Sequence, residues 1–295
     1  MNYKMMGRFT AQILFLEALF LLPPLGISLF LKEKAAIHGF VLTLAIAAGG
    51  AAVLYLACKN AKNAFFATDG MVCVAFSWFV LSLVGALPFC FSGAIPSFVD
   101  AFFETVSGFT TTGASILKAV EPMEKGLLFW RSFTHWIGGM GVLVFLLAIT
   151  PAKGTEKGFT MHLLRAESPG PSVGKLVPKM RKTAGILYLL YIGLTVLDIL
   201  FLLAGGMSLF DALCTAFGTA GTGGFGVKND SIAGYSPYIQ NVTSVFMLLF
   251  GVNFSCYYLL VMGQLRSVFK DEELRLYAAI VLGSVALITW NLLGF

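Results

Sequence analysis

Two stretches of the sequence, SFVDAFFETVSGFTTTG at 97–113 and SLFDALCTAFGTAGTGG at 208–224, are related copies that decide the fold. Each begins with an apolar segment, near 97–109 and 208–220, that is too short to cross a bilayer as a helix at about 1.5 Å per residue. A helix of that length must return to the side it entered from, or end inside protein. The copies therefore predict two re-entrant half-helices. At a constant offset of 111 residues the identities include Ser97 with Ser208, Asp100 with Asp211, Ala101 with Ala212, and Gly113 with Gly224.

Each copy opens with a helix-start signal. Ser97-x-x-Asp100 and Ser208-x-x-Asp211 fit a capping-box pattern, and each aspartate places negative charge near the positive end of the helix dipole. An ordinary helix start would give the same signal, so the caps alone do not identify a pore.

The segment after each half-helix has no apolar side chain to face lipid. Backbone at this depth is tolerated only when it is buried in protein or lines a watery path. Glycine permits dihedrals that turn successive carbonyls toward one axis, and rings of carbonyls can replace the hydration shell of potassium. The predicted potassium ligands, mainly through backbone carbonyls, are Thr110, Thr111, Thr112, Gly113, Gly221, Thr222, Gly223 and Gly224.

The glycines allow two other interpretations. The run GTAGTGGFG (218–226) could cradle a phosphate, but it lacks the Gly-Lys-Ser/Thr ending and follows a helical segment, not a strand. A glycine-based helix-packing motif explains either segment alone. It explains the pair poorly, because both segments follow half-length helices.

Composition places the chain in a membrane. Hydrophobic residues make up 58% of the 295, charged residues 12%, and mean hydropathy is +0.85, whereas soluble domains carry about a quarter charged residues. We expect an all-α integral membrane protein with about seven spans plus the two half-helices, and a kink near Leu22 where Pro23 and Pro24 follow. The expected spans are 9–31, 38–58, 71–92, 126–150, 184–206, 241–263 and 276–295.

The basic residues predict the orientation. With a cytoplasmic N-terminus and both half-helices entering from outside, the inner segments hold fourteen Lys and Arg and the outer segments five. The net charge of +5 thus reflects topology and does not indicate nucleic acid. The inner residues are Lys4, Arg8, Lys59, Lys62, Lys153, Lys157, Arg165, Lys175, Lys179, Arg181, Lys182, Arg266, Lys270 and Arg275, and the outer ones Lys32, Lys34, Lys118, Lys125 and Lys228.

No acid–base or metal constellation at plausible spacing indicates an enzyme. The five cysteines form no CxxC pair, which argues against a zinc site or a disulfide framework.

Around these residues the chain resembles the Trk/Ktr/HKT superfamily of potassium transporters, specifically its TrkH-type membrane subunits. The similar stretches cover nearly the whole chain: LPPLGISL (22–29), FFETVSGFTTTGAS (102–115), FWRSFTHWIGGMGVLV (129–144), GTAGTGGFGVKNDSI (218–232) and NFSCYYLL (253–260).

The resemblance implies potassium uptake across the bacterial inner membrane, with no organic cofactor in this chain. Its fold implies four M1–pore helix–M2 repeats around one pore, with one filter glycine per repeat. Gly113 and Gly224 match two of these, and Gly223 is an alternative for the second because a one-residue shift aligns almost as well. Implied partners are the lipid bilayer, a second copy in a homodimer, and a cytoplasmic nucleotide-binding regulatory subunit of the TrkA type.

The same alignment predicts the domain organisation. The divisions are an N-terminal helix pair (1–60), a first pore-loop repeat (61–152), a cytoplasmic basic linker (153–183), a second repeat (184–265) and the start of a third (266–295). Since the family has four repeats, the expectation is a truncated product. The alternative class is a secondary transporter with a midplane site built from two broken helices.

Several charged residues fall inside apolar segments, where charge is costly. Arg131 and His135 lie four apart and share a helix face, and a structural role is favoured, with Arg131 snorkelling or pairing with Glu104 or Glu124. For Glu104, lowering the potential of the ion path and fixing the filter packing are equally open. Glu17 and Asp198 each need a partner or a watery cavity, and a buried hydrogen-bonded acid is favoured for Asp198 over a role in coupling.

Overall fold

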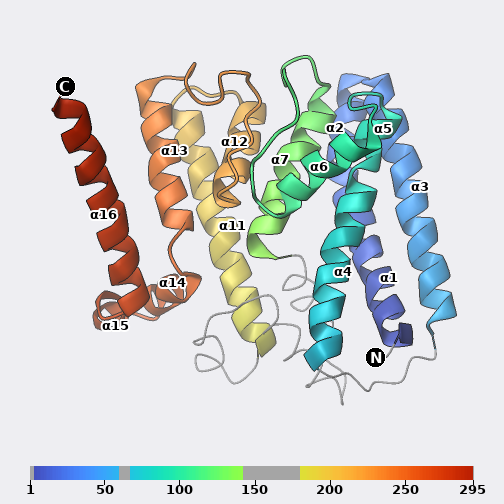
Figure 1. The fold of residues 1–295 in the computed structure, drawn as a ribbon, viewed down its shortest axis with the longest axis horizontal. Helices are drawn as coiled ribbons and strands as arrows, with labels where there is room; N and C mark the ends of the chain where they lie inside the picture. The colour runs from blue at the N-terminus through green and yellow to red at the C-terminus, as the bar shows by residue number, and fades with distance from the viewer. Residues whose placement is uncertain (1–2, 60–66, 142–179, 295) are drawn as a thin grey trace.

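The structure, a computed structural model, describes residues 3–59, 67–141 and 180–294, and the regular elements in these ranges are all helices (Figure 1). Five are long and apolar enough to span a membrane, or six if one bent pair is counted as a span. The expected all-α membrane architecture is confirmed. The helices are α1 (Tyr3–Phe20), α2 (Leu22–Leu31), α3 (Lys34–Ala57), α4 (Ala67–Gly85), α5 (Leu87–Phe91), α6 (Phe98–Phe109), α7 (Lys125–Met140), α11 (Met180–Ala204), α12 (Leu209–Ala220), α13 (Pro237–Phe250), α14 (Phe254–Val261), α15 (Leu265–Phe269) and α16 (Glu272–Leu293).

Parts of the prediction lie outside the described residues. The span expected at 126–150 is described only as far as 141, and most of the basic linker at 153–183 falls beyond the described ranges. The kink near Leu22 is confirmed, because α1 ends at Phe20 and α2 restarts with Pro23 and Pro24 in its first turn.

The span expected at 241–263 is not one straight helix. It divides into α13 and α14, which meet at an angle of 89°. Asn253 caps α14 by accepting a hydrogen bond from the Ser255 amide at 2.9 Å, and the Tyr277 hydroxyl donates to the Leu248 carbonyl at 3.0 Å at the end of α13. The sequence did not predict this break, because both halves are apolar and hydropathy does not indicate the direction of the backbone.

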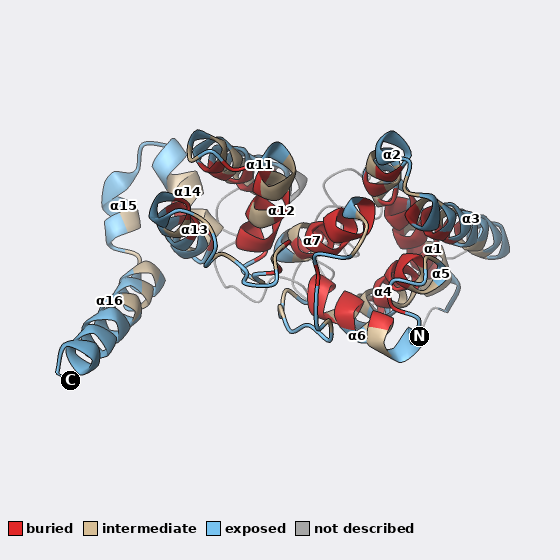
Figure 2. Ribbon diagram, turned by 90° about the horizontal axis from the view of Figure 1, so that it is seen from above, coloured by how far each residue is buried: buried red, intermediate tan, exposed pale blue. Residues whose placement is uncertain are grey.

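The two repeats lie side by side with the same orientation. Figure 1 shows the loops after α6 and α12 at one end of the bundle, opposite the N-terminus. Seen from that end in Figure 2, buried residues concentrate in α1, α4, α6, α7 and α12, whereas α16 is exposed along its length. Helix α7 packs against both half-helices, α6 and α12, and so joins the two repeats.

Two glutamates each stand before one helix and cap the start of another: Glu33 caps α7, and Glu124 caps α3. Glu33 precedes α3, yet its carboxylate accepts hydrogen bonds from the Lys125 and Gly126 amides at the start of α7, at 2.8 and 3.0 Å. Glu124 precedes α7, yet its carboxylate accepts from the Ala36 amide in the first turn of α3, at 2.5 Å. Each helix therefore receives its N-terminal cap from the other helix, with the favourable charge for its dipole.

We expect Glu124→Ala to destabilise the docking of α3 by about 0.5–2 kcal/mol, the usual cost of losing an N-cap. Hydrogen exchange of the first turn of α3 and thermal unfolding in detergent measure this. Glu124→Gln is the matched control, because it keeps an acceptor oxygen and should lose less. Equal exchange in Glu124→Ala and the parent chain would contradict the exchanged caps.

Candidate functional site

The two half-length helices begin as the sequence predicts. Ser97 Oγ accepts a hydrogen bond from the Asp100 amide at 3.4 Å, and Ser208 Oγ accepts from the Asp211 amide at 3.1 Å. Helices α6 and α12 each contain 12 residues, which corresponds to about 18 Å and less than a bilayer core. Helices of this length would end part-way across a bilayer.

The backbone after each helix repeats the same conformation at an offset of 111 residues. Thr111 and Thr222 have φ of 54° and 53°, and Gly113 and Gly224 have φ of 75° and 83°. The hydrogen bonds repeat too, since the amides of Thr111 and Thr222 bond the carbonyls of Gly108 and Thr219 at 3.0 and 2.9 Å. By this correspondence Gly224, and not Gly223, is the structural equivalent of Gly113.

The two glycine segments, Thr110–Gly113 and Gly221–Gly224, lie against each other. A side chain added at Gly113 would overlap the Gly223 carbonyl oxygen, and one added at Gly223 would overlap the His135 ring. A cavity of about 200 Å³ is lined by both Gly113 and Gly224 together with Arg131. The structure thus brings the two predicted glycine segments together beside one cavity.

The remaining predicted residues differ in exposure. Thr110, Thr112 and Thr222 are exposed, whereas Gly221 is buried against the α7 backbone at His135. The Thr110 hydroxyl donates to the Val106 carbonyl at 2.7 Å and lies 2.8 Å from the Thr112 hydroxyl. The side chains of Thr110 and Thr112 are therefore engaged locally, and their hydroxyls are less available to a cation than the backbone carbonyls are.

Glu104 fixes the chain that leaves the first glycine segment. Its carboxylate accepts from the Ser115 hydroxyl at 3.0 and 3.2 Å and from the Ile116 amide at 3.0 Å. The same group pairs with Arg131 at 2.6 Å. Of the two roles left open for Glu104, these contacts support the packing role.

Arg131 and His135 contact the second glycine segment. The Arg131 Nη1 donates to the Gly226 carbonyl at 3.0 Å, and its guanidinium lies 3.6 Å from the centre of the Phe225 ring. The His135 ring stacks on Phe225 with centroids 3.9 Å apart. The structural role expected for both residues agrees with these contacts, and the partner of Arg131 is Glu104, since Glu124 caps α3 instead.

Glycines let α7 approach both half-helices, α6 and α12, closely. A side chain added at Gly138 would overlap the Phe109 carbonyl of the first repeat, and one added at Gly221 would lie 2.5 Å from the His135 carbonyl. Tyr191 of α11 donates to the Trp136 carbonyl at 3.0 Å. Helix α7 is thus the element that sets the relative position of the two segments.

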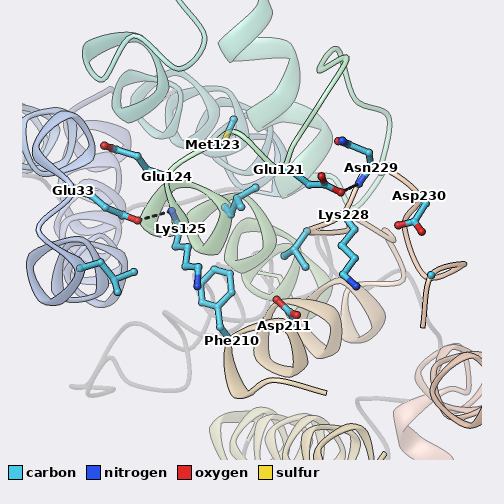
Figure 3. Close-up of a pocket in the computed structure, with 14 residues that line it drawn as sticks. Glu33, Glu121, Met123, Glu124, Lys125, Phe210, Asp211, Lys228, Asn229 and Asp230 are labelled. Atoms are coloured by element: carbon cyan, nitrogen blue, oxygen red, sulfur yellow. Dashed lines mark hydrogen bonds between the residues drawn. The ribbon is translucent and has the colours of Figure 1, made fainter. Parts of the chain in front are cut away.

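A larger cavity of about 820 Å³ lies beside this region, between α2, α7, α12 and the loop after α12. Figure 3 shows Glu33 beside Lys125 and Glu121 beside Asn229. The Asn229 backbone amide donates to Glu121 at 3.0 Å, and the Asn229 side-chain oxygen accepts from the Val120 amide at 2.8 Å. These bonds join the loop before α7 to the loop after α12. Five acidic residues line the cavity against two lysines: Glu33, Glu121, Glu124, Asp211 and Asp230 against Lys125 and Lys228.

Two acids singled out in the sequence are buried within apolar helices. Glu17 and Asp198 are fully buried, and their carboxylates have no hydrogen-bond partner within the described part of the chain. The burial expected for Asp198 is confirmed, but the expected hydrogen bond is not found there.

Several contacts were missed by sequence reasoning. The roles of Phe225 and Ser115 could have been suspected only from their nearness to the glycine segments, and that of Asn229 from the polar loop after the second copy. The exchange between Glu33 and Glu124 has a weak signal, an acid directly before each apolar run.

Comparison with known proteins identifies the family. The family profile described as "TrkH: Cation transport protein" matches residues 32–282, most of the chain. The chain belongs to the TrkH family. This is a family of cation transport proteins and not of enzymes.

Among TrkH relatives, the Trk system potassium uptake protein of Halomonas elongata is 34% identical over 99% of this chain and 61% of its own length. The corresponding protein of Escherichia coli (strain K12) is 33% identical over 98% of this chain and 60% of its own. The crystal structure of the potassium transporter TrkH from Vibrio parahaemolyticus matches with a TM-score of 0.79 and 29% identity, over 96% of this chain and 57% of that one. The chain therefore spans about three fifths of the length of these relatives.

Proposed function

We propose that the protein to which this chain contributes takes up potassium ions through a pore whose filter is lined by backbone carbonyls. The observation that carries the proposal is the repeated backbone conformation at Thr111–Gly113 and Thr222–Gly224, at the ends of two half-length helices that enter from the same end of the bundle. The printed names of the relatives, potassium uptake proteins, support the same ion.

The proposed ligands are carbonyls of the two glycine segments. Carbonyl rings can replace the hydration shell of an ion, and the C-terminal ends of α6 and α12 direct partial negative charge to the same region. In this proposal the eight residues Thr110–Gly113 and Gly221–Gly224 supply two quarters of the filter. The excess of acids around the larger cavity would raise the local cation concentration.

We extend the proposal to location and assembly. The bias of Lys and Arg supports a cytoplasmic N-terminus, and the family resemblance supports a location in the bacterial inner membrane. The family resemblance supports a homodimer, a cytoplasmic nucleotide-binding regulator of the TrkA type, and the division into an N-terminal pair, two repeats and the start of a third. The alternative class of secondary transporter is disfavoured, because many of those use inverted repeats and the two copies here share one orientation.

Rubidium uptake into liposomes tests the proposal. The chain would be reconstituted alone and as an extension to four repeats using the C-terminal part of the Halomonas elongata relative. We expect the four-repeat form to accumulate rubidium and to be inhibited by potassium far more than by sodium. Empty liposomes are the control, and a four-repeat form that is folded and inactive, or that prefers sodium, would contradict the proposal.

A further inference from the structure

One buried ion pair contacts both glycine segments at once. Glu104 of α6 and Arg131 of α7 are 1% and 3% exposed, and theirs is the only ion pair among the described residues. On one side the Glu104 carboxylate binds Ser115 and Ile116, directly after the first segment. On the other side Arg131 binds the Gly226 carbonyl, directly after the second. Hydrogen bonds shorter than 3.1 Å therefore connect Ile116, which follows the first segment, through Glu104 and Arg131 to Gly226, which follows the second.

The second repeat lacks a pair of its own. At the offset of 111 residues, Glu104 corresponds to Thr215 and Arg131 to Val242, or to Thr243 if the longer loop before α13 is counted. None of these carries charge. The second segment thus receives its charged side-chain contact, from Arg131 to Gly226, from the first repeat.

Stability alone does not account for the pair. Taking two charges out of water is costly, and apolar replacements of buried ion pairs are often neutral or stabilising. What the pair supplies is geometry, because the planar guanidinium donates to Glu104 and Gly226 in directions fixed by one rigid group. The Phe225 ring, 3.6 Å from the guanidinium carbon, restricts that group further.

We propose that Arg131 is a positioning residue that couples the two filter segments, so that the carbonyl alignment of the second segment depends on Glu104 of the first repeat. The proposal rests on the proposed function in so far as it assigns ion discrimination to this alignment. Its structural part stands independently, since it predicts that a change at Glu104 loosens residues in the other repeat.

Hydrogen exchange of the purified full chain tests the structural part. We expect Glu104→Gln to speed exchange about tenfold in both 113–117 and 222–226, as for residues coupled through direct contacts. The matched control is Thr215→Val, the equivalent position in α12, which should leave 113–117 unchanged. If Glu104→Gln loosened 113–117 and left 222–226 as in the parent chain, the coupling would be disproved.

Rubidium-over-sodium selectivity of the four-repeat form tests the functional part. We expect Arg131→Leu to lower the selectivity ratio about tenfold, which corresponds to about 1.4 kcal/mol. Arg131→Lys should recover part of it, because lysine restores the charge but not two fixed donors. Thr243→Val should keep the parental ratio. An unchanged ratio in a folded Arg131→Lys and Arg131→Leu pair would overturn the role in discrimination. Absence of rubidium uptake by the parent form would overturn the proposed function instead, and the exchange experiment would still decide the coupling.

Discussion

Replacing Gly113 with alanine is expected to lower the rubidium-over-sodium selectivity of the four-repeat form. The residue has φ of 75°, which costs a non-glycine residue about 1–2 kcal/mol. The added methyl group would also overlap the Gly223 carbonyl, which must move. Contacts with charged groups are worth about 1.5–3 kcal/mol, so misaligning one carbonyl should lower the rubidium-over-sodium ratio by at least about tenfold. Competitive uptake in liposomes measures the ratio.

The chain offers a matched control for backbone strain. Gly93 has φ of 76°, and a side chain added there would meet no atom within 4 Å. Gly93→Ala therefore imposes the same strain without the overlap, and it should keep the parental ratio. Gly224→Ala is also free of overlap and should be milder than Gly113→Ala. If Gly113→Ala and Gly93→Ala had the same small effect, the contact between the two segments would have no part in selectivity.

Replacing Trp130 with alanine is expected to give the largest loss of stability. The side chain is fully buried, its Nε1 donates to the Gly85 carbonyl at 2.9 Å, and its ring packs edge-on against Phe109 with centroids 6.1 Å apart. Buried aromatic-to-alanine changes cost about 3–5 kcal/mol in soluble proteins. For Trp130→Ala we expect a loss near the lower end of this range. The unfolded helices are surrounded by lipid and not by water, so the hydrophobic contribution is small, whereas the cavity and the lost hydrogen bond still destabilise the protein. Thermal unfolding in detergent measures the loss.

Trp290→Ala is the control for this change. Trp290 lies in α16 and is 79% exposed, so the same substitution should leave the unfolding temperature within the scatter of the parent chain. Similar losses for Trp130→Ala and Trp290→Ala would mean that the burial of Trp130 does not support the fold.

Sequence reasoning predicted the half-helices well, because their signals are local. The Ser-x-x-Asp caps, the short apolar length and the positive-φ glycines all act within one segment, and the structure has each of them where expected. The choice between Gly223 and Gly224 needed backbone dihedrals, which residue identity leaves open at a pair of adjacent glycines.

Contacts between distant segments could not be predicted in the same way. The sequence permits Arg131 to pair with either Glu104 or Glu124, and only the approach of α7 to α6 decides for Glu104. The link from Arg131 to Gly226 spans 95 residues and two repeats, and nothing in the residue pattern marks a carbonyl as its acceptor. The bend between α13 and α14 was missed because both halves are apolar.

The exchanged glutamates have a consequence for biosynthesis. The carboxylate that caps α3 is 88 residues further along the chain, so the ribosome makes α3 long before its cap exists. During insertion the first two spans must therefore enter the bilayer before the Glu124 carboxylate can cap the N-terminal end of α3. The N-terminal ends of α3 and α7 are capped only once α7 has packed beside α3. We therefore expect the N-terminal pair and the first repeat to assemble together.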